Sequence, residues 1–561
     1  MIKNQCLSLL ILTIIFIVTG NLKAAIINVS SISALQTAIN NSTTGDIINL
    51  GNGHYANNNI SISKNNITVQ AATQGGVFLD GTNSILITGS NNIFSGFQFT
   101  ENFTMTGVAI TVRGNNNTIT QLNFNGYSAG KFIQLEGTNA VVSYSNFQNK
   151  LCVLTTSKSG TGDMVQIIPN ETTPGNNIIR YCSFQHMPGL GGDFGNECIR
   201  IGDGVYSTYI SRTVVEYCYF EDTGLGDSEA ISVKSRENVL RYNTMKNNPD
   251  AMFCFRRGDN NVAYGNFFIN SGGLRAKESN NIFCYNNYFE KSGVTGSANA
   301  VSYVYYTANS TYVLDNINFL HNTFVDCGDI DFGGTGATNG TWVNNIFKKS
   351  GTIFVNPNSG TSFKNNIYTG NLGINIPSGM TLADPKLALN SDGYYGLTSA
   401  SPAIGKASNG YPAMLNLQGI DTLFLDIKGL TRPVSRLLKD IGCEQFNANG
   451  TITNRPLKLS DVGPIYLKSL AGIETQKENL NFNVQVNLAT MKLVFHHFSP
   501  HTSKINLSIY SLSGTLIKTI DIMSTENQQQ TVDISNLKSG MYLVRLTALD
   551  LSNTAKFILG N

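Results

Sequence analysis

Apolar and polar positions alternate along most of the chain, and this alternation recurs as a unit. The unit has the form Asn-apolar-x-x-polar-Asn-x-aromatic and reads, for example, NNIFSGFQF, NNIIRYCSF and NIFCYNNYF. Most successive units end at a nearly constant interval, and three longer intervals, which end at Phe184, Phe220 and Phe324, leave room for extra loops. The closing residues of the units are Phe99, Phe124, Phe147, Phe184, Phe220, Met245, Phe268, Phe289, Phe324, Phe347 and Tyr368.

A period of roughly 20–25 residues predicts a parallel β-helix, in which each coil contains about three short strands and three turns. Alternating apolar residues then point inward, and no coil can bury its apolar face without its neighbours. Asn is typical of the bends because its side chain hydrogen-bonds to nearby backbone and tolerates turn conformations. Leucine-rich repeats share the period, but their Leu-x-x-Leu-x-Leu pattern is missing here. Long stripes of period 3.6, which would indicate helices, are also missing. We therefore predict an all-β, right-handed parallel β-helix.

Changes in this pattern divide the chain. The start carries Lys3, an apolar run and small residues at Ala24 and Ala25, which is the layout of a signal peptide. The segment ISALQTAINN predicts a short helix that caps the first coil, and from about residue 385 the repeat fades into closing coils and a cap. Seven strand-like runs separated by turn signals near the C-terminus indicate a small β-sandwich. The predicted parts are a signal peptide (1–24), the β-helix (25–446), a linker (447–479) and the β-sandwich (480–561).

Composition narrows the functional class. Charged residues make up 13% of the chain, against roughly 25% in an average protein. The net charge of +2 is too small to indicate a nucleic-acid-binding protein, and no segment after the signal peptide is apolar enough to span a membrane. The nine cysteines show no CxxC spacing. Cys182 and Cys218 occupy equivalent repeat positions, either as stacked thiols or as a pair. These features favour an exported protein whose attraction to a polyanion depends on a local cluster of cations.

Charged residues concentrate on four successive coils, from GGDFGNECIRIG to SGGLRAKESNNIFCYNNYF. Residues one period apart stack about 4.8 Å apart in a β-helix. Arg256 follows Lys234 by about one period, and Arg275 follows Arg256 by nearly one further period, so we expect these three side chains to form a stacked ladder. Such a ladder would bind a polyanionic chain. Further candidates for contact with that chain are Lys150, Arg200 and Arg257.

Oxygen donors lie beside this ladder. Asn196, Asp227 and Glu229 fall on adjacent coils, and a set of this kind suits Ca²⁺, which takes oxygen ligands in loose geometry. A cation would disperse the charge that develops when the C5 proton of a uronic acid is removed. Lys234 can remove that proton if neighbouring positive charge lowers its pKa. An arginine near the glycosidic oxygen assists departure of the leaving group, so this set of residues indicates β-elimination.

The motifs NECIRIG, SEAISVKS, FRRGDNNVAYGNFF and GGLR resemble polysaccharide lyase family 6, which includes alginate lyases and the dermatan-sulfate lyase chondroitinase B. The resemblance implies that Lys234 is the Brønsted base and Arg256 the general acid. It also implies a substrate-binding role for Arg275. The Ca²⁺ ligands that it implies are Asn196, Asp227 and Glu229. Two positions depart from the family pattern, because Asp227 stands where the family usually has Glu and Arg257 where it usually has His.

The C-terminal part shows a second resemblance. The pieces IYSLSGTLIKT, ISNLKSGMYLVRL and KFILGN resemble the C-terminal sorting domain of the type IX secretion system. This implies recognition by the type IX machinery and a secreted or cell-surface protein. A carbohydrate-binding module is the alternative for this part.

The predicted function is secreted lyase activity on an acidic polysaccharide, with alginate preferred. Dermatan sulfate is the main alternative substrate, because its sulfate groups would need additional basic contacts and Arg257 could provide one. A C5 epimerase would use the same proton abstraction without cleaving the chain. A non-catalytic glycan-binding β-helix is a further alternative. A glycosidase of the polygalacturonase type needs clustered Asp residues around a water molecule, and the sequence has no such cluster.

Overall fold

A computed structural model describes residues 24–559 with internal gaps. The gaps are 101–106, 151–161, 188–194, 225–226, 306–311, 335–336, 416, 418–422, 436–437, 469–480, 488–490, 499–502, 512–515, 525–528 and 549–550. Residues 1–23 of the predicted signal peptide lie outside the described residues. The chain forms two compact units, Met1–Lys468 and Ser469–Asn561.

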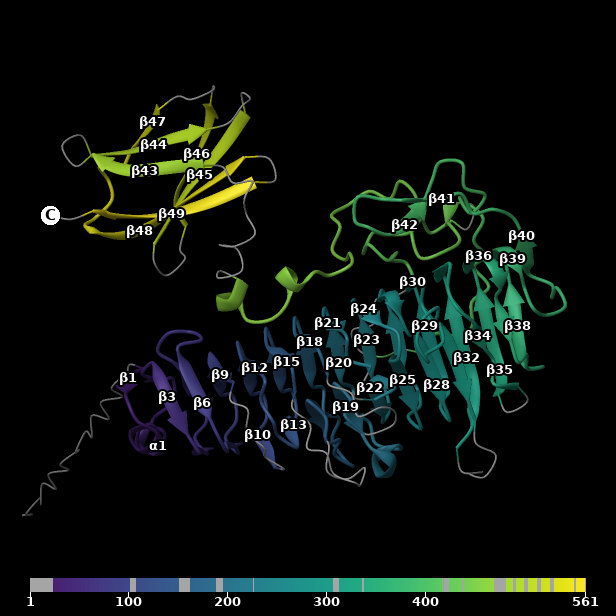
Figure 1. The fold of residues 1–561 in the computed structure, drawn as a ribbon, viewed down its shortest axis with the longest axis horizontal. Helices are drawn as coiled ribbons and strands as arrows, with labels where there is room; N and C mark the ends of the chain where they lie inside the picture. Colours follow the sequence, from purple (N-terminus) through teal and green to yellow (C-terminus); the bar gives the residue numbers. More distant parts are fainter. Residues whose placement is uncertain are drawn as a thin grey trace, which may run out of the picture. The chain divides into compact units, whose positions relative to one another are not determined.

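Three parallel sheets, named A, B and C here, make up most of the first unit (Figure 1). Sheet A has 14 strands: β1 (Ile26–Val29), β2 (Ile47–Leu50), β5 (Thr68–Ala71), β8 (Ile93–Ser95), β11 (Thr118–Thr120), β14 (Val141–Ser143), β17 (Ile178–Arg180), β20 (Val214–Glu216), β23 (Val239–Arg241), β26 (Val262–Tyr264), β29 (Asn280–Tyr285), β32 (Leu314–Leu320), β35 (Ala337–Val343) and β38 (Thr361–Lys364). Sheet B also has 14 strands: β3 (Gly53–Ala56), β6 (Val77–Asp80), β9 (Phe97–Phe99), β12 (Asn123–Asn125), β15 (Asn146–Gln148), β18 (Ser183–Gln185), β21 (Tyr219–Glu221), β24 (Thr244–Asn248), β27 (Phe267–Ser271), β30 (Tyr288–Glu290), β33 (Thr323–Val325), β36 (Ile346–Thr352), β39 (Asn366–Asn371) and β40 (Met380–Leu382). Sheet C has 12 strands: β4 (Asn59–Ile62), β7 (Ser84–Ile87), β10 (Val108–Val112), β13 (Lys131–Leu135), β16 (Val165–Ile167), β19 (Ile199–Gly202), β22 (Glu229–Lys234), β25 (Met252–Arg256), β28 (Leu274–Lys277), β31 (Val301–Val304), β34 (Ile330–Asp331) and β37 (Phe354–Val355).

The strand register confirms the sequence repeat and the parallel β-helix. Every predicted closing residue lies in sheet B opposite the closing residue of the neighbouring coil, from the pair Phe99–Phe124 to the pair Phe347–Tyr368. Their rings form an inner ladder, as in Phe289 and Phe324, whose ring centroids lie 4.4 Å apart. The period observed along the sequence is therefore the length of a coil.

A ladder of fully buried asparagines joins the later coils. In each step, the backbone N–H of one asparagine donates to the side-chain oxygen of the next, at 2.8–3.0 Å. Each side-chain amide also donates to a backbone carbonyl, at 2.8–3.0 Å. The ladder thus satisfies buried backbone groups at the turns, which would otherwise be left without partners. Its members are Asn243, Asn266, Asn287, Asn322, Asn345 and Asn366.

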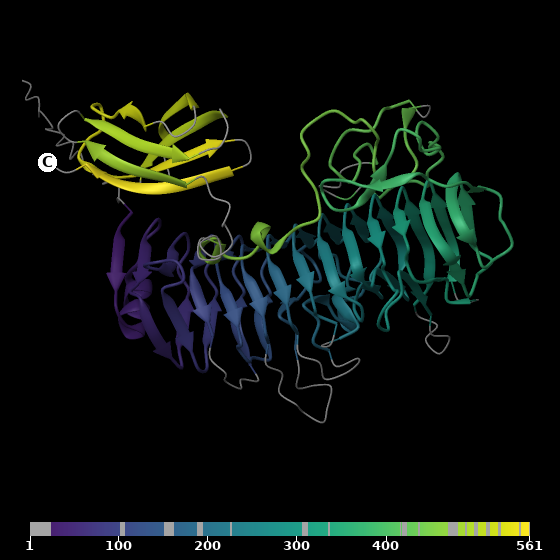
Figure 2. The ribbon, with the colours of Figure 1, turned by 45° about the horizontal axis from the view of Figure 1, so that its top comes forward.

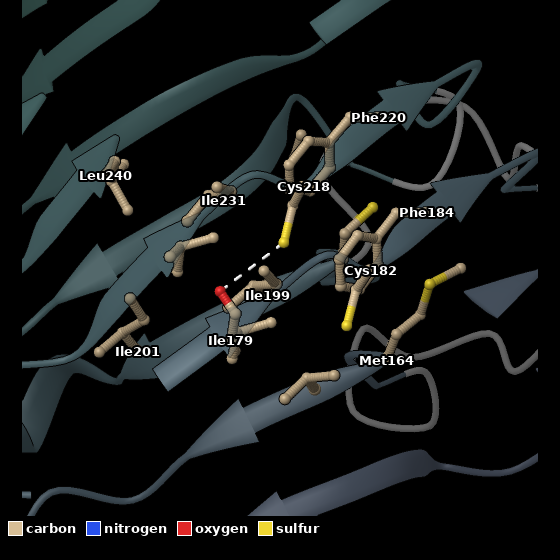
Figure 3. Close-up of a cluster of buried hydrophobic side chains, with 14 of the residues drawn as sticks. Met164, Ile179, Cys182, Phe184, Ile199, Ile201, Cys218, Phe220, Ile231 and Leu240 are labelled. Atoms are coloured by element: carbon tan, nitrogen blue, oxygen red, sulfur yellow. Dashed lines mark hydrogen bonds between the residues drawn. The ribbon is translucent and has the colours of Figure 1, made fainter. Parts of the chain in front are cut away.

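The core of the middle coils contains the two cysteines that the repeat aligned (Figure 3). Both are fully buried free thiols. The thiol of Cys182 lies 3.8 Å from the carbonyl of Val142, and that of Cys218 lies 3.7 Å from the carbonyl of Ile179. Of the two alternatives for these residues, the structure contains the stacked thiols.

The predicted capping helix is confirmed as α1 (Ile32–Asn41). The Ser31 hydroxyl accepts the backbone N–H of Ala34 at 3.1 Å, which caps the N-terminus of the helix. Leu35 and Ile39 are fully buried. The helix therefore covers the apolar end of the first coil.

The segment 384–446 differs from its prediction. Its described residues add no coil, and its strands β41 (Leu387–Leu389) and β42 (Tyr395–Leu397) form an antiparallel pair. The segment instead covers the outer sides of the last coils (Figure 2). Tyr394 packs against Phe267 and Tyr288 of sheet B, with ring centroids 5.4 and 5.2 Å apart. The outward side chains of these strands are apolar, so covering them stabilises the fold more than extending the array would.

The first unit continues beyond residue 446 into the predicted linker, as far as Lys468. An extended segment, which contains η4 (Leu459–Asp461), runs back along the coils. Asn454 donates to the carbonyl of Gly265 at 2.9 Å, the N–H of Gly463 donates to the carbonyl of Tyr181 at 2.8 Å, and the N–H of Ile465 donates to Gln121 Oε1 at 2.7 Å. The stretch 447–468 of the predicted linker therefore belongs to the β-helix unit.

The second unit has the two antiparallel sheets of a small β-sandwich. One sheet contains β43 (Asn481–Asn487), β44 (Lys492–Phe498) and β47 (Gln529–Asp533). The other contains β46 (Leu516–Ser524), β45 (Ser503–Ser511), β48 (Gly540–Ala548) and β49 (Leu551–Leu559). Residues of both sheets, including Leu493 and Val544, form one buried cluster. Over the residues that the structure describes, no helix has the length and apolar character needed to cross a membrane.

We predict that Asn287→Ala lowers the free energy of unfolding by about 2–3 kcal/mol, because it leaves buried backbone groups without partners. Urea denaturation of the full chain measures this change. Asn49→Ala is the matched control, since Asn49 makes an exposed ladder contact with Asn28 and its loss should cost about 0.5 kcal/mol or less. Equal effects of the two substitutions would contradict a stabilising role for the buried ladder.

A second prediction concerns acid stability. His321 is fully buried, and its Nε2 lies 2.6 Å from the Tyr411 hydroxyl. Burial holds the pKa of His321 well below its usual range, and the positive charges of Arg432 and Lys439 lower it further. The unfolded imidazole takes up a proton below about pH 6.5 while the folded one stays neutral, so stability falls as the pH decreases. The contribution is about 1 kcal/mol per pH unit.

We expect His321→Gln to remove this contribution from the difference in unfolding free energy between pH 7.5 and 5.5. His186→Gln is the control, because the His186 side chain is half exposed. A pH dependence of His321→Gln equal to that of the unsubstituted protein would contradict the assignment.

Candidate functional site

Four strands of sheet C, β19, β22, β25 and β28, bring the predicted site residues together. Apolar residues such as Ile231 and Phe253 point into the core, so the alternating positions face outward. The outward positions carry Arg200, Lys234 and Arg256, whose side chains are 22%, 12% and 25% exposed. These side chains are thus mostly packed and partly accessible from the open face of the sheet.

Lys234 lies beside Arg256 in this surface. Val233 of β22 pairs with Phe255 of β25, so the residues that follow them, Lys234 and Arg256, lie side by side. The Lys234 ammonium donates to Glu197 Oε1 at 3.1 Å. The Glu197 side chain is only 3% exposed, so a nearly buried carboxylate holds one side of the ammonium.

Glu229 is the partner of two arginines. Its Oε1 lies 3.4 Å from Arg256 Nη1 and 3.9 Å from Arg275 Nη1. Its Oε2 accepts the hydroxyl hydrogen of Ser232, and Arg275 also donates to the Ser228 hydroxyl at 3.1 Å. Glu229 therefore fixes both guanidinium groups at the start of strand β22.

The predicted Lys–Arg–Arg ladder is wrong in its third member. Arg275 pairs with Cys254, whereas Arg256 pairs with Lys277. Lys234, Arg256 and Lys277 therefore form one row, and Arg275 lies in the adjacent outward row. The prediction failed because the spacing from Arg256 to Arg275 is shorter than one coil. The residue one full coil after Arg256 is Lys277.

Three ion pairs join successive coils along sheet C, although Arg200 lies opposite Ser232, in the row next to that of Lys234. Arg200 Nη2 lies 2.8 Å from Asp163 Oδ2, and the other two pairs are Lys234–Glu197 and Arg256–Glu229. In each pair the carboxylate belongs to one coil and the cation to the next. Asp163, Glu197 and Glu229 all stand two residues before a core residue of aligned strands, namely Val165, Ile199 and Ile231. The three carboxylates thus form a ladder beside the cations.

Asp163 and Glu197 act as a coupled pair of carboxyl groups. Burial raises the pKa of Asp163 well above its usual range, and the charge of Glu197 raises it further, although Arg200 opposes the shift. Burial also acts to raise the pKa of Glu197, but Lys234, a hydrogen bond from Asp163 and Arg200 together lower it to about 2. The two shifts run in opposite directions, so Glu197 loses its proton at a lower pH than Asp163 does.

The three predicted metal ligands lie at the same edge of neighbouring strands. Asp227 Oδ2 accepts the N–H of Gly195 at 2.8 Å, and Asp227 Oδ1 accepts the N–H of Glu229 at 2.9 Å. These contacts bring Asp227 next to both Asn196 and Glu229, and all three residues are nearly fully buried. An amide and two carboxylates are the oxygen donors that Ca²⁺ prefers, so the donor set fits this ion in kind. Among the described residues, no group of three His, Cys, Asp or Glu side chains could hold a metal. A site at Asp227 and Glu229 therefore needs the amide oxygen of Asn196 as its third ligand.

The remaining predicted contacts have different surroundings. Arg257, in a left-handed conformation with φ of 63°, donates from Nε to buried Glu278 at 2.8 Å and lies 4.8 Å from the centroid of Tyr312. Lys150 is 1% exposed, and its ammonium donates to the carbonyls of Gly130 and Gly162. Arg257 therefore lies at the rim of the cationic surface, whereas Lys150 binds backbone carbonyls beneath it.

Sequence reasoning missed Asp163 and Tyr312. Asp163 stands before the four charged coils, so no cluster of charges marks it. Aligning DMVQI with ECIRI would have shown an acidic residue at the same repeat position as Glu197. Tyr312 stands outside the repeat units, and only its contact with Arg257 singles it out.

A cavity of about 500 Å³ lies elsewhere, between the stacked rings of Tyr181 and Tyr217 and the segment around Asn454. Arg455 and Asp461 line it but pair with each other at 2.7–2.8 Å. Because Arg455 and Asp461 neutralise each other there, the charged surface of sheet C is the better candidate site.

Comparisons with known proteins agree with this geometry. Residues 29–382 match the family model of chondroitinase B, and residues 479–560 match that of a secretion system C-terminal sorting domain. No curated protein matches the chain.

Solved structures share the fold of the first unit. The PL6 family alginate lyase AlyGC is 24% identical with a TM-score of 0.59, and the match covers 69% of this chain and 59% of AlyGC. A mannuronic acid specific family 6 lyase from human gut microbiota is 21% identical with a TM-score of 0.53, over 62% of this chain and 86% of that one. The alginate lyase AlyF-OU02, solved in complex with G6, is 19% identical with a TM-score of 0.55, over 70% of this chain and 94% of that one. The chain thus spans about three fifths of the length of AlyGC, and identities at this level show the fold.

Proposed function

Because the chain belongs to the chondroitinase B family, we propose that it is a polysaccharide lyase that cleaves a uronate-containing polymer by β-elimination. The observation that carries this proposal is the placement of Lys234 and Arg256 side by side on the open surface of sheet C. The family predicted from the sequence motifs is confirmed, as is the C-terminal sorting domain.

Each step of the elimination has a side chain in place. Lys234 takes the proton from C5 of the uronate, and a double bond forms between C4 and C5 as the bond to the glycosidic oxygen breaks. Arg256, on the neighbouring strand, supplies a proton to the leaving oxygen. Arg275 and Arg200 provide donors for carboxylates of neighbouring sugars, since guanidinium groups bind carboxylates in a bidentate manner. No water is consumed, and the product carries an unsaturated end.

Alginate is the proposed substrate. The solved structures that share the fold at TM-scores of 0.53–0.59 include lyases described as acting on alginate or mannuronic acid. Dermatan sulfate is the second candidate because the matching family model is that of chondroitinase B. Arg257 at the rim supplies a further cation that a sulfate could engage.

The proposed cofactor is Ca²⁺, held by Asn196, Asp227 and Glu229. A bound cation would stabilise negative charge developing on the uronate carboxylate. Glu229 would then be shared between the metal and the two arginines. The C-terminal sorting domain supports a secreted or cell-surface location and type IX machinery as a partner.

We predict that the purified full-length protein raises the ultraviolet absorbance of alginate solutions through the conjugated, unsaturated uronate. Lys234→Ala should lower kcat by at least about 100-fold, the contribution typical of a general base. Lys246→Ala should leave kcat unchanged, because Lys246 is exposed on sheet B, away from the site. Dermatan sulfate is tested in parallel to decide between the two substrates.

Two outcomes would contradict the proposed function. An absence of signal on every uronate polymer would remove lyase activity. Exchange of the C5 hydrogen with deuterated solvent, without chain cleavage, would indicate an epimerase instead.

We also predict that Ca²⁺ binds with a stoichiometry near one in calorimetric titration of metal-free protein. Glu229→Gln should weaken binding at least about tenfold, because it removes a charged oxygen ligand. Glu221→Gln is the control, since Glu221 lies on sheet B. Undetectable Ca²⁺ binding by the unsubstituted protein would contradict this site while leaving the lyase assay as a separate test.

A further inference from the structure

We propose that Glu197 is a positioning residue for Lys234 and that Asp163 and Arg200 hold Glu197 in place from behind. This inference rests on the proposed function, because it identifies the residues that hold Lys234, the base of that reaction, in position. It extends the site from the outward surface into the layer beneath it.

The contact between Glu197 and Lys234 restricts the ammonium. The 3.1 Å hydrogen bond comes from the tip of a long, flexible side chain, which would otherwise sample many rotamers. The Lys234 side chain is 12% exposed and that of Glu197 only 3%. Most of the Lys234 side chain is therefore packed, and Glu197 determines where its ammonium lies.

Glu197 is itself held by its neighbours. Its Oε2 is buried, and no other donor reaches it among the described residues except through the carboxyl group of Asp163. Asp163 is fully buried, and its Oδ2 lies 2.8 Å from Arg200 Nη2. The Asp163 side chain contacts Glu197, so Arg200 anchors Asp163 and Asp163 in turn supports Glu197.

The energetics favour a positional role over a stabilising one. Burying an ion pair adds little net stability, because desolvation offsets the attraction, but it selects one geometry. A proton transfer requires the base within hydrogen-bond reach of its target. A displacement of about 1 Å at a reacting group can cost about 100-fold in rate. Glu197 thus affects turnover more than substrate binding.

The test compares Glu197→Gln with Glu197→Met. The glutamine amide keeps both contacts, because its oxygen accepts from Lys234 and its N–H donates to Asp163. Methionine has a similar volume and removes the acceptor. We expect Glu197→Met to lower kcat about 100-fold with KM changed less than threefold, and Glu197→Gln to stay within tenfold of the unsubstituted kcat. Glu136→Gln, which breaks the Arg113–Glu136 pair at the surface, is the control.

A second measurement does not depend on turnover. The rate at which acetic anhydride modifies Lys234, measured by peptide mass spectrometry, should rise at least about fivefold in Glu197→Met and remain within twofold in Glu197→Gln. An unchanged modification rate in Glu197→Met, or a kcat of that variant within twofold of the unsubstituted protein, would overturn the positioning role. A protein inactive on every uronate polymer would instead overturn the proposed function, and the modification rates would still report on the contact.

Discussion

In-register stacking of parallel coils is the constraint on which the rest of this structure depends. Each strand pairs with the equivalent strand of the next coil, so equivalent residues lie one strand spacing apart. The buried ladder from Asn243 to Asn366 maintains this register at one corner, because a shift of one residue would leave its amides and the adjacent N–H groups without partners. The aromatic ladder that includes Phe289 and Phe324 adds packing along the same axis.

The site follows directly from this constraint. Lys234 and Arg256 come from different coils, yet the register makes them neighbours. Stacking of like charges is unfavourable, and Glu197 and Glu229 compensate it, each by pairing with the cation of the next coil. Asp163 pairs with Arg200 in the same way, so every one of these cations has an acidic side chain beside it. A surface built this way suits the acidic chain of the proposed function although the net charge of the protein is only +2.

Much of the fold and of the candidate site could be predicted from the sequence, because in a repeat the number of residues between two positions determines how far apart they lie in the structure. The closing residues of the repeat, helix α1 and the seven C-terminal strands were all predicted. Counting residues failed where a spacing only approximated the length of a coil. Arg275 was assigned to the row of Arg256 but lies beside Cys254. The sequence places residues 447–468 in a linker (447–479) because the contacts of this stretch, such as Ile465 with Gln121, join residues far apart in the chain and follow no local pattern. Asp163 was missed because it stands before the four charged coils, where no cluster of charges marks it.

The outward faces of the later coils explain why the site lies on sheet C. On sheet A the outward residues include Val262 and Phe283, and on sheet B they include Phe267 and Ile346. These residues are apolar, and the segment 384–446 buries them by folding back over both sheets. The corresponding positions of sheet C carry cations and hydroxyl groups, which a protein segment could cover only at a large cost in desolvation. The distribution of apolar residues over the three faces thus directs the covering segment to two of them and leaves the charged face open to a ligand that can itself supply negative charge.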